Sequence, residues 1–324
     1  MEIKGKSVIV IGGAGFIGSH VVEELLKEDV AEIVVYDNFC RGTIGNLATA
    51  LKDKRVKIFE AGGDICQTDI LSSAIKGKDY VFHLAALWLL QCHEYPRAAF
   101  DVNIRGCFNV LEACRDNNVK KLIYSSSASV YGDALFTPMT EEHPLNNRTF
   151  YGATKIAGEQ MCRAFFARYG LNYVGLRYMN VYGPRQDYRG AYVAVIMKIL
   201  DRIDAGLPPV VYGDGSQAYD FVFVRDVAGA NIRALKSDVS DRFYNVGTGV
   251  KTTIKEICET LLRLKNSDLH VKYEPAGQTF VTHRVGSIEK ADGEIGFRAK
   301  ITLEEGLREL IRWRDEDKKK RIQA

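Results

Sequence analysis

Tyr151 and Lys155 lie four positions apart in the segment FYGATKIAGEQ, a spacing that places both side chains on one face of a helix. A free tyrosine has a pKa of about 10, which makes it a poor base at neutral pH. A nearby ammonium group favours the phenolate and lowers that pKa. The pair is therefore a candidate for acid–base catalysis, although the same spacing also occurs as a stabilising contact on a solvated helix.

A run of serines adds a third polar group. Ser125, Ser126 and Ser127 follow an apolar stretch in IYSSSASVYGD. Taken singly, Ser125 and Ser126 are also explained as serines that satisfy a loop backbone. Ser127 combined with Tyr151 and Lys155 would supply a hydrogen bond to a substrate hydroxyl whose proton the tyrosine accepts. We therefore predict Ser127, Tyr151 and Lys155 as the catalytic residues.

The elements that must position these residues alternate between strands and helices. Continuous apolar runs separated by helical patterns are typical of a parallel sheet covered on both faces. Ligands of such sheets bind at the carboxyl ends of the strands, where the serine run lies. We predict an α/β fold with a Rossmann-type, doubly wound parallel sheet. The predicted strands are SVIVIG (7–12), EIVVYD (32–37), RVKIFEAG (55–62), DYVFHLAA (79–86), KKLIYSSS (120–127) and LNYVGLRYMN (171–180).

The second half of the chain is less regular and predicts a smaller C-terminal α/β domain. The helix AYVAVIMKILDRIDAG is followed by a short strand in PPVVYGDG, and YDFVFV (219–224) then resumes the strand pattern. The clearest later helices are TTIKEICETLLRLK and TLEEGLRELIRWRDED. We predict a dinucleotide-binding domain at 1–176 and about 219–248, and a substrate domain at about 177–218 and 249–324.

The first predicted strand runs into a glycine-rich turn. Gly12, Gly15 and Gly18 in IVIGGAGFIGSH lie directly after the strand and at the start of the first helix. A diphosphate can approach the backbone there only where side chains are absent, and the helix N-terminus offers free N–H groups. Three glycines alone also occur in turns that bind nothing, but here strand, turn and helix follow in the required order.

Asp37 ends the second predicted strand, in VVYDNF, and would face the adenosine ribose in this topology. A carboxylate there accepts hydrogen bonds from both ribose hydroxyls and repels a 2′-phosphate, so we predict NAD rather than NADP. Arg41, four residues later, weakens this exclusion because a guanidinium can accommodate a phosphate. Bound nicotinamide would add a second cation near Tyr151, and Lys155 can also hold the nicotinamide ribose.

Composition excludes several other classes of protein. With 324 residues, 46% of them hydrophobic, the chain has ample material for a core. Its net charge of +3 is too small to imply a polyanion-binding surface, so we expect no nucleic-acid partner. No stretch is long enough to cross a bilayer, no leader is recognised, and no Cys or His cluster has metal-binding spacing. We therefore expect a cytoplasmic protein with reduced thiols, no metal and no membrane partner.

These motifs together resemble the extended short-chain dehydrogenase/reductase family, and within it the nucleotide-sugar 4-epimerases of the UDP-glucose 4-epimerase type. The resemblance covers nearly the whole chain and is more specific for the family than for the substrate. It implies an NAD-dependent enzyme with a UDP-sugar substrate, and a homodimer in which helices 96–118 and 150–169 form a four-helix bundle. The matching motifs are GGAGFIG, YDN, GDI, FHLAA, VNIRGCFNVLEAC, SSSASVYGD, YGATK, LRYMNVYGPRQ, GAYVAVI, GDGSQAYDFVFVRDVA and NVGTG.

The resemblance also implies roles at matching positions. Asp64 and Ile65 would lie by the adenine, Asn103 would support the cofactor side of the site, and Asn180 and Arg284 would contact the diphosphate of the nucleotide sugar. The expected cofactor contacts are Gly12, Gly15, Phe16, Ile17, Gly18, Asp37, Asn38, Asp64, Ile65, Leu84, Ala85, Ala86, Asn103, Ser125, Tyr151, Lys155 and Tyr178. The expected substrate contacts are Ser127, Tyr151, Asn180, Ala191, Tyr192, Tyr212, Tyr219 and Arg284.

The residues after Ser127 separate the reactions of the family. Dehydratases carry an acidic pair after the catalytic hydroxyl and decarboxylating relatives place a glutamate nearby, whereas this chain has Ala128 and Ser129. The resemblance therefore implies epimerisation at C4 of a UDP-hexose, N-acetylhexosamine or uronic acid, through a 4-keto intermediate. A dehydratase, a decarboxylase or a 4-keto reductase stays an alternative. So does a non-catalytic dinucleotide-binding sensor, against which the complete catalytic set argues.

Two positions depart from the family pattern. Tyr219, in GDGSQAYDF, stands where the family has an arginine, so one diphosphate cation is missing and Arg185, Arg189 or another residue would have to replace it. Trp88, in LAALWLLQCHEYP, stands in a loop that is smaller and more polar in the family. It either shapes the sugar pocket or anchors the loop. Both departures bear on which nucleotide sugar is bound.

Overall fold

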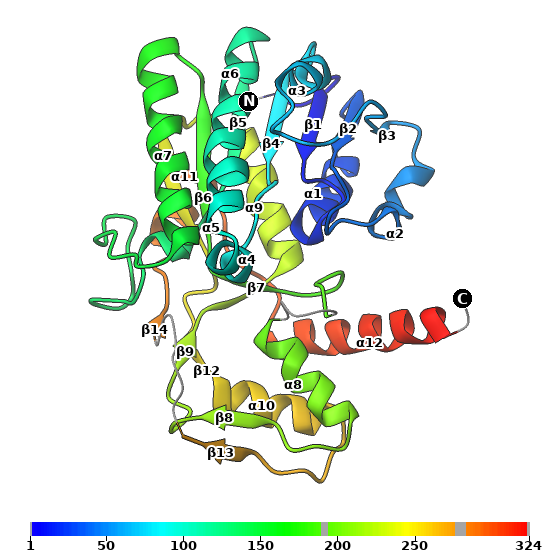
Figure 1. Ribbon diagram of the computed structural model, residues 1–324, viewed down its shortest axis with the longest axis vertical. Coiled ribbons are helices and arrows are strands. Elements are labelled where there is room, and N and C mark those ends of the chain that lie inside the picture. The colour runs from blue at the N-terminus through cyan, green and yellow to red at the C-terminus, as the bar shows by residue number, and fades with distance from the viewer. Residues whose placement is uncertain (1, 189–193, 276–282, 323–324) are drawn as a thin grey trace.

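The computed structural model describes residues 2–188, 194–275 and 283–322, and a parallel sheet of seven strands forms its centre (Figure 1). The strand order is β11-β6-β5-β4-β1-β2-β3. The order reverses between β1 and β4, which creates the switch point at which ligands of such sheets bind. This confirms the predicted Rossmann-type sheet. Its strands are β1 (Ser7–Ile11), β2 (Glu32–Tyr36), β3 (Val56–Ile58), β4 (Tyr80–His83), β5 (Lys121–Ser127), β6 (Tyr173–Tyr178) and β11 (Arg242–Val246).

Helices cover both faces of the sheet because alternate residues of each strand point to opposite sides. Val8 and Val10 of β1 belong to one hydrophobic cluster, and Ile9 and Ile11 belong to another. The first cluster lies under α1 (Phe16–Leu26), α9 (Val224–Lys236) and α11 (Glu289–Ile295). The second lies under α3 (Thr68–Ile75), α6 (Cys107–Asp116) and α7 (Phe150–Tyr169). The shorter helices of this part are α2 (Ile44–Leu47), η1 (Ala50–Lys52), α4 (Leu89–Glu94), α5 (Pro96–Ala99), the π-helical η2 (Phe100–Gly106) and η3 (Ala128–Val130).

The C-terminal part has its own hydrophobic cluster, to which α8 (Val195–Asp204), α10 (Ile254–Leu264) and α12 (Leu303–Ile322) contribute. The amphipathic α10 begins with a capping box in which Thr253 and Glu256 satisfy each other's backbone N–H groups. Figure 1 shows α8 and α10 below the central sheet, beside short strands. These strands are β7 (Asn180–Tyr182) with β10 (Phe221–Phe223), β9 (Ala218–Tyr219) between β12 (Thr252–Thr253) and β14 (His283–Arg284), and β8 (Val210–Tyr212) with β13 (Lys272–Glu274).

The single strand predicted at 219–224 is wrong, because the chain divides there into β9 and β10, which belong to different sheets. The break lies at Asp220. Its side chain is fully buried, and its carboxylate accepts hydrogen bonds from the backbone N–H of Thr248 (2.8 Å) and of Gly249 (2.9 Å). The backbone changes its partner strand at the same residue, because the N–H of Asp220 donates to the carbonyl oxygen of Arg284 (2.9 Å) and its carbonyl oxygen accepts from the N–H of Asn180 (2.9 Å).

The domain boundaries stay a prediction. Residue 176 falls inside β6, and β11 rejoins the central sheet beside β6 after the chain has passed through α8 and the short strands. Among the described residues, no helix is long and apolar enough to cross a membrane. Within the same ranges, no group of three or more His, Cys, Asp or Glu side chains is arranged to hold a metal ion.

Candidate active site

The glycine turn between β1 and α1 forms a wall without side chains. Gly12 has a φ of +81°, and a Cβ there would lie 2.7 Å from the backbone nitrogen of Ala85. A Cβ at Gly18 would lie 2.1 Å from the carbonyl oxygen of Gly12. Gly12, Gly15 and Gly18 all line a cavity of about 280 Å³ at the start of α1. An open backbone at a helix N-terminus fits the diphosphate of a dinucleotide.

Asp37 is bound to this turn through its carboxylate. One oxygen accepts a hydrogen bond from the N–H of Ala14 (2.9 Å) and the other accepts one from the N–H of Phe39 (2.8 Å). Burial raises the pKa of Asp37, against the opposing effect of these hydrogen bonds. The second predicted strand therefore ends with its acidic side chain fixed beside the glycine turn.

The expected cofactor residues fall into two groups. The first group lines the smaller cavity and consists of Gly12, Gly15, Phe16, Ile17, Gly18, Leu84, Ala86, Ser125, Tyr151, Lys155 and Tyr178. Those outside its lining are Asp37, Asn38, Asp64, Ile65, Ala85 and Asn103. Asn103 is buried and supports the lining instead, because its amide exchanges hydrogen bonds with the backbone of Leu87 (2.8 and 2.9 Å) and donates to Thr154 (3.1 Å).

A second cavity of about 850 Å³ adjoins the first and extends toward α8 and the short strands. The expected substrate residues Ser127, Asn180, Tyr212, Tyr219 and Arg284 all line it. Ala191 and Tyr192 lie outside the described residues. The residues that line both cavities are Phe16, Ile17, Trp88, Ser126, Tyr151, Tyr178, Gln186 and Ala194. Tyr151 thus stands where a dinucleotide and a second ligand would meet.

The catalytic candidates come from the adjoining ends of β5 and α7. Thr149 caps α7 by accepting a hydrogen bond from the N–H of Gly152 (3.0 Å), so that Tyr151 lies in the first turn. Ser127 ends β5 and accepts a hydrogen bond from the N–H of Ser129 (3.1 Å). Nζ of Lys155 donates to the carbonyl oxygen of Ser125 (2.7 Å) and lies 5.7 Å from the Tyr151 ring centroid. The structure therefore brings the three predicted catalytic side chains together.

Arg284 and Tyr219 are neighbours on paired strands, since β14 lies parallel to β9 with these two residues in register. Nη2 of Arg284 donates to the carbonyl oxygen of Gly132 (3.3 Å), while its buried Nε has no hydrogen-bond partner among the described residues. Burial lowers the pKa of Arg284 to about 10, which leaves the side chain cationic at neutral pH. A cation with an unused donor at the cavity wall suits an anionic ligand.

Arg185, named as one substitute for the missing arginine, does not line the larger cavity. It forms an ion pair with Glu23 of α1 and lines the smaller cavity. Arg189, the other named substitute, lies outside the described residues. Two cations that the sequence analysis missed, Lys198 and Arg202 of α8, do line the larger cavity. No motif marks them, because they are the polar positions of an ordinary amphipathic helix.

The chain also resembles known proteins over nearly its whole length. The sequence model of the NAD dependent epimerase/dehydratase family matches residues 8–247. The chain belongs to this family. A UDP-glucose 4-epimerase of Mycolicibacterium smegmatis is 31% identical, over 94% of this chain and 96% of that protein.

Two solved structures support the same assignment. The UDP-N-acetylglucosamine 4-epimerase of Methanobrevibacter ruminantium M1, in complex with UDP-N-acetylmuramic acid, is 37% identical, with a TM-score of 0.90 over 97% of this chain and 99% of that one. The UDP-glucose 4-epimerase of Thermotoga maritima with UDP-glucose is 31% identical, with a TM-score of 0.89 over 96% and 99%. Membership of the NAD-dependent epimerase/dehydratase family confirms the predicted family and cofactor.

The electrostatics of the site bear on the predicted lowering of the Tyr151 pKa. Tyr151 is half-buried and lines both cavities, and desolvation raises its pKa to about 12, against the lowering effect of the hydrogen bond with Ser127. Burial lowers the pKa of Lys155 to about 8. In the protein without cofactor the pKa of Tyr151 is therefore raised, because desolvation outweighs nearby positive charge, and its lowering by Lys155 together with bound nicotinamide stays a prediction. Without the cofactor, the Tyr151 hydroxyl is therefore neutral at neutral pH.

A buried ion pair between Glu159 and Arg177 connects the strand and the helix that carry the catalytic candidates, β5 and α7. Glu159, two turns after Tyr151, accepts hydrogen bonds from Ser126 (2.6 Å) and from Nε and Nη2 of Arg177 (2.8 and 2.7 Å). Nη1 of Arg177 donates to the hydroxyl of Tyr131 (2.8 Å). The pair therefore joins β5, α7 and β6 at the end of the sheet that carries the site.

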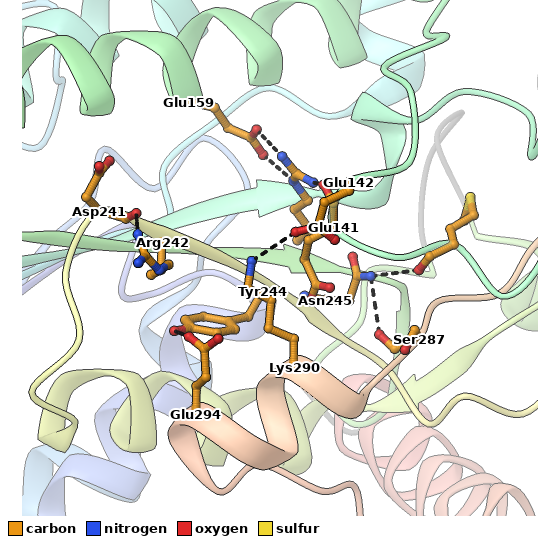
Figure 2. Close-up of polar contacts among 12 residues, drawn as sticks. Glu141, Glu142, Glu159, Asp241, Arg242, Tyr244, Asn245, Ser287, Lys290 and Glu294 are labelled. Atoms are coloured by element: carbon orange, nitrogen blue, oxygen red, sulfur yellow. Dashed lines mark hydrogen bonds and ion pairs between the residues drawn. The ribbon is translucent and has the colours of Figure 1, made fainter.

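The network continues to β11 and to the segment that precedes α11 (Figure 2). The hydroxyl of Tyr131 donates to the amide oxygen of Asn245 (2.7 Å), whose amide nitrogen donates to the carbonyl oxygen of Ser287 (3.2 Å). The backbone N–H of Asn245 donates to Glu141 (2.8 Å). Polar groups between Ser126 and Ser287 thus connect the catalytic strand with the segment that follows Arg284. Few of these residues belong to the family motifs, and the residues that bond to each other are distant in sequence. The sequence analysis therefore did not predict this network.

Proposed function

We propose that the protein epimerises a UDP-sugar at C4. The observation that carries this proposal is the lining of the larger cavity around Tyr151. Ala128 and Ser129 follow Ser127, and the only carboxylate among the described residues of that lining is Asp201, which lies on α8 and is paired with Arg314. A dehydratase or decarboxylase that follows the family pattern would need an acid or base close to the catalytic hydroxyls.

The chemistry follows from the positions of the three side chains. Tyr151 would accept the proton of the C4 hydroxyl while Ser127 holds the same oxygen by a hydrogen bond. NAD⁺, when bound, would supply the hydride acceptor and a positive charge beside the phenol. Lys155, fixed by the carbonyl of Ser125, would hold the ribose end of the cofactor and add a second positive charge. Return of the hydride to the other face of the 4-keto sugar, together with return of the proton from Tyr151 to the C4 oxygen, then gives the epimer.

The choice of a UDP-sugar is supported by the two solved relatives, whose complexes both contain a UDP derivative. Arg284, with its unused Nε donor, is the residue we assign to the diphosphate. Tyr212 and Gln217, which line the far part of the same cavity, would face the nucleoside. The sugar itself can be a hexose, an N-acetylhexosamine or a uronic acid.

The test is conversion of a panel of UDP-sugars, followed by proton NMR, without added NADH. Both C4 epimers should form from either starting sugar. In D₂O the hydrogen at C4 should stay undeuterated, because it travels as a hydride and not through water. Loss of water, release of CO₂ or net consumption of NADH would select the dehydratase, the decarboxylase or the reductase. Tight NAD binding with no conversion of any sugar would favour the sensor.

We also propose a homodimer, formed by the outer faces of η2, α6 and α7. Four aromatic side chains of these helices are exposed: Phe100 (48%), Phe108 (41%), Phe150 (56%) and Tyr169 (46%). Figure 1 shows α6 and α7 next to each other at one side of the molecule. Exposed aromatic side chains on neighbouring helices are typical of a protein interface.

A further inference from the structure

Arg41 lies in the wall of the smaller cavity, four residues after Asp37. The same loop therefore carries a carboxylate, which suits a ribose 2′-hydroxyl, and a guanidinium, which can accommodate a 2′-phosphate. Family membership establishes that the cofactor is NAD. Asp37 alone does not explain this selectivity if Arg41 is free to bind a phosphate. The contacts of Arg41 therefore decide what the loop recognises.

Asp187 binds Arg41 from a different segment of the chain. Nη2 of Arg41 lies 3.2 Å from Oδ2 of Asp187, which also lines the smaller cavity. The guanidinium carbon of Arg41 lies 5.0 Å from the ring centroid of Trp88. An ion pair and a cation–π contact together fix the direction of a planar guanidinium.

The segment that carries Asp187 is attached on two sides. Arg185 forms an ion pair with Glu23 of α1. The hydroxyl of Tyr188 donates a hydrogen bond to Asp317 of α12 (2.6 Å). Asp187 lies between these two attachments, which hold this part of the chain beside the smaller cavity that Asp187 lines.

We propose that Asp187 is a cofactor-specificity residue that binds and neutralises Arg41, so that Asp37 governs recognition of the ribose and NADP is rejected. A 2′-phosphate would have to displace Asp187 from the guanidinium and would be repelled by its charge. Asp187 therefore turns a loop that contains an arginine into one that selects NAD. This inference rests on the cofactor alone and is independent of which sugar the enzyme converts.

The experiment measures binding of NADH and NADPH to dinucleotide-free protein by the change in nicotinamide fluorescence. Asp187→Asn should raise the affinity for NADPH relative to NADH about tenfold, because a freed guanidinium gains a charge-assisted hydrogen bond to phosphate. Arg41→Met should leave the ratio unchanged, since Arg41 is already engaged. The double variant Arg41→Met/Asp187→Asn should lose the gain. Asp187→Ser serves as a second uncharged variant, and melting curves check that each protein is folded.

Glu316→Gln is the charge-matched control, because Glu316 lines a cavity beside Asp187 and forms no ion pair with Arg41 among the described residues. This control should not change the ratio of the two affinities. The proposal fails if both uncharged variants at position 187 keep the ratio of the native protein. It also fails if the gain persists in the double variant, because Arg41 would then have no part in it. Neither result depends on turnover of a sugar.

Discussion

Tyr151 has a pKa of about 12 in the protein without cofactor, so its hydroxyl is protonated throughout the neutral range. Tyr151→Phe removes this hydroxyl and keeps the ring that lines both cavities. We expect epimerisation to fall by at least about 100-fold, since no other group would accept the proton, while NADH still binds. The measurement is the rate of C4 interconversion together with NADH fluorescence. Tyr169→Phe, at the exposed end of the same helix, is the control and should keep native turnover. Native turnover of Tyr151→Phe would contradict the assigned role.

Lys155 lowers the stability of the cofactor-free protein. Its pKa falls from 10.5 to about 8 through burial, which corresponds to about 3 kcal/mol of unfolding free energy lost at pH 7. Between about pH 8 and 10.5, Lys155 is largely neutral in the folded protein but still protonated in the unfolded chain. This loss of stability therefore diminishes as the pH rises through that range. Lys155→Met should therefore unfold at higher denaturant concentration than the native protein at pH 7, and this gain should shrink at pH 9.5.

The control for this prediction is Lys57→Met, because the ammonium of Lys57 is exposed (64%). It should show no pH-dependent gain. The expected gain for Lys155→Met is about 1–3 kcal/mol, because removal of the ammonium also removes its hydrogen bond to the carbonyl of Ser125. A Lys155→Met protein less stable than the native one at pH 7 would show that the hydrogen bond outweighs desolvation.

At the scale of elements, the buried pair of Glu159 and Arg177 holds α7 against β5 and β6. Both side chains are almost fully buried (1% and 6% exposed), so removal of either charge leaves the other unpaired in a dry environment. Glu159→Gln and Arg177→Met should each cost about 3–5 kcal/mol in denaturant unfolding, and the double variant should cost less than their sum. Arg225→Met, which breaks the exposed pair with Glu309, should cost less than about 1 kcal/mol. Additive losses would show that the two residues act independently.

Elements with a local pattern could be predicted from the sequence, and elements defined by distant pairing could not. The strand at 7–12 and the glycine turn were predicted because apolar runs and glycines act within a few residues. The break at Asp220 was missed because its partners, Thr248 and Gly249, lie far along the chain. The segment around η2 was predicted as one helix, and its π-helical turn leaves no mark in a 3.6-residue period.

At the scale of the whole molecule, the site residues could be named but their environment could not. Spacing predicted that Tyr151 and Lys155 share a face, and the structure brings Ser127 to them. The pKa of Tyr151 depends instead on how much protein surrounds it, which is set by packing of segments that are distant in sequence. For the same reason, the ion pair between Arg41 and Asp187 could not be predicted from the sequence, in which the two residues are far apart.

The proposed dimer is the property of the whole molecule most open to measurement. A four-helix interface would bury the exposed rings of η2, α6 and α7, and each aromatic ring contributes a large apolar area. We expect light scattering of the native protein to give twice the chain mass of 36.2 kDa. Phe100→Glu/Phe108→Glu should give the mass of one chain, because two carboxylates per protomer would have to be desolvated in the interface. Tyr273→Glu, on β13 away from these helices, introduces a charge at a similarly exposed ring (49%) and should stay dimeric.

A native protein of single-chain mass at all concentrations would reject the dimer. A folded, dimeric double variant would place the interface on another face. Turnover by the monomeric variant would show that each chain holds a complete site, as expected from cavities lined by residues of one protomer.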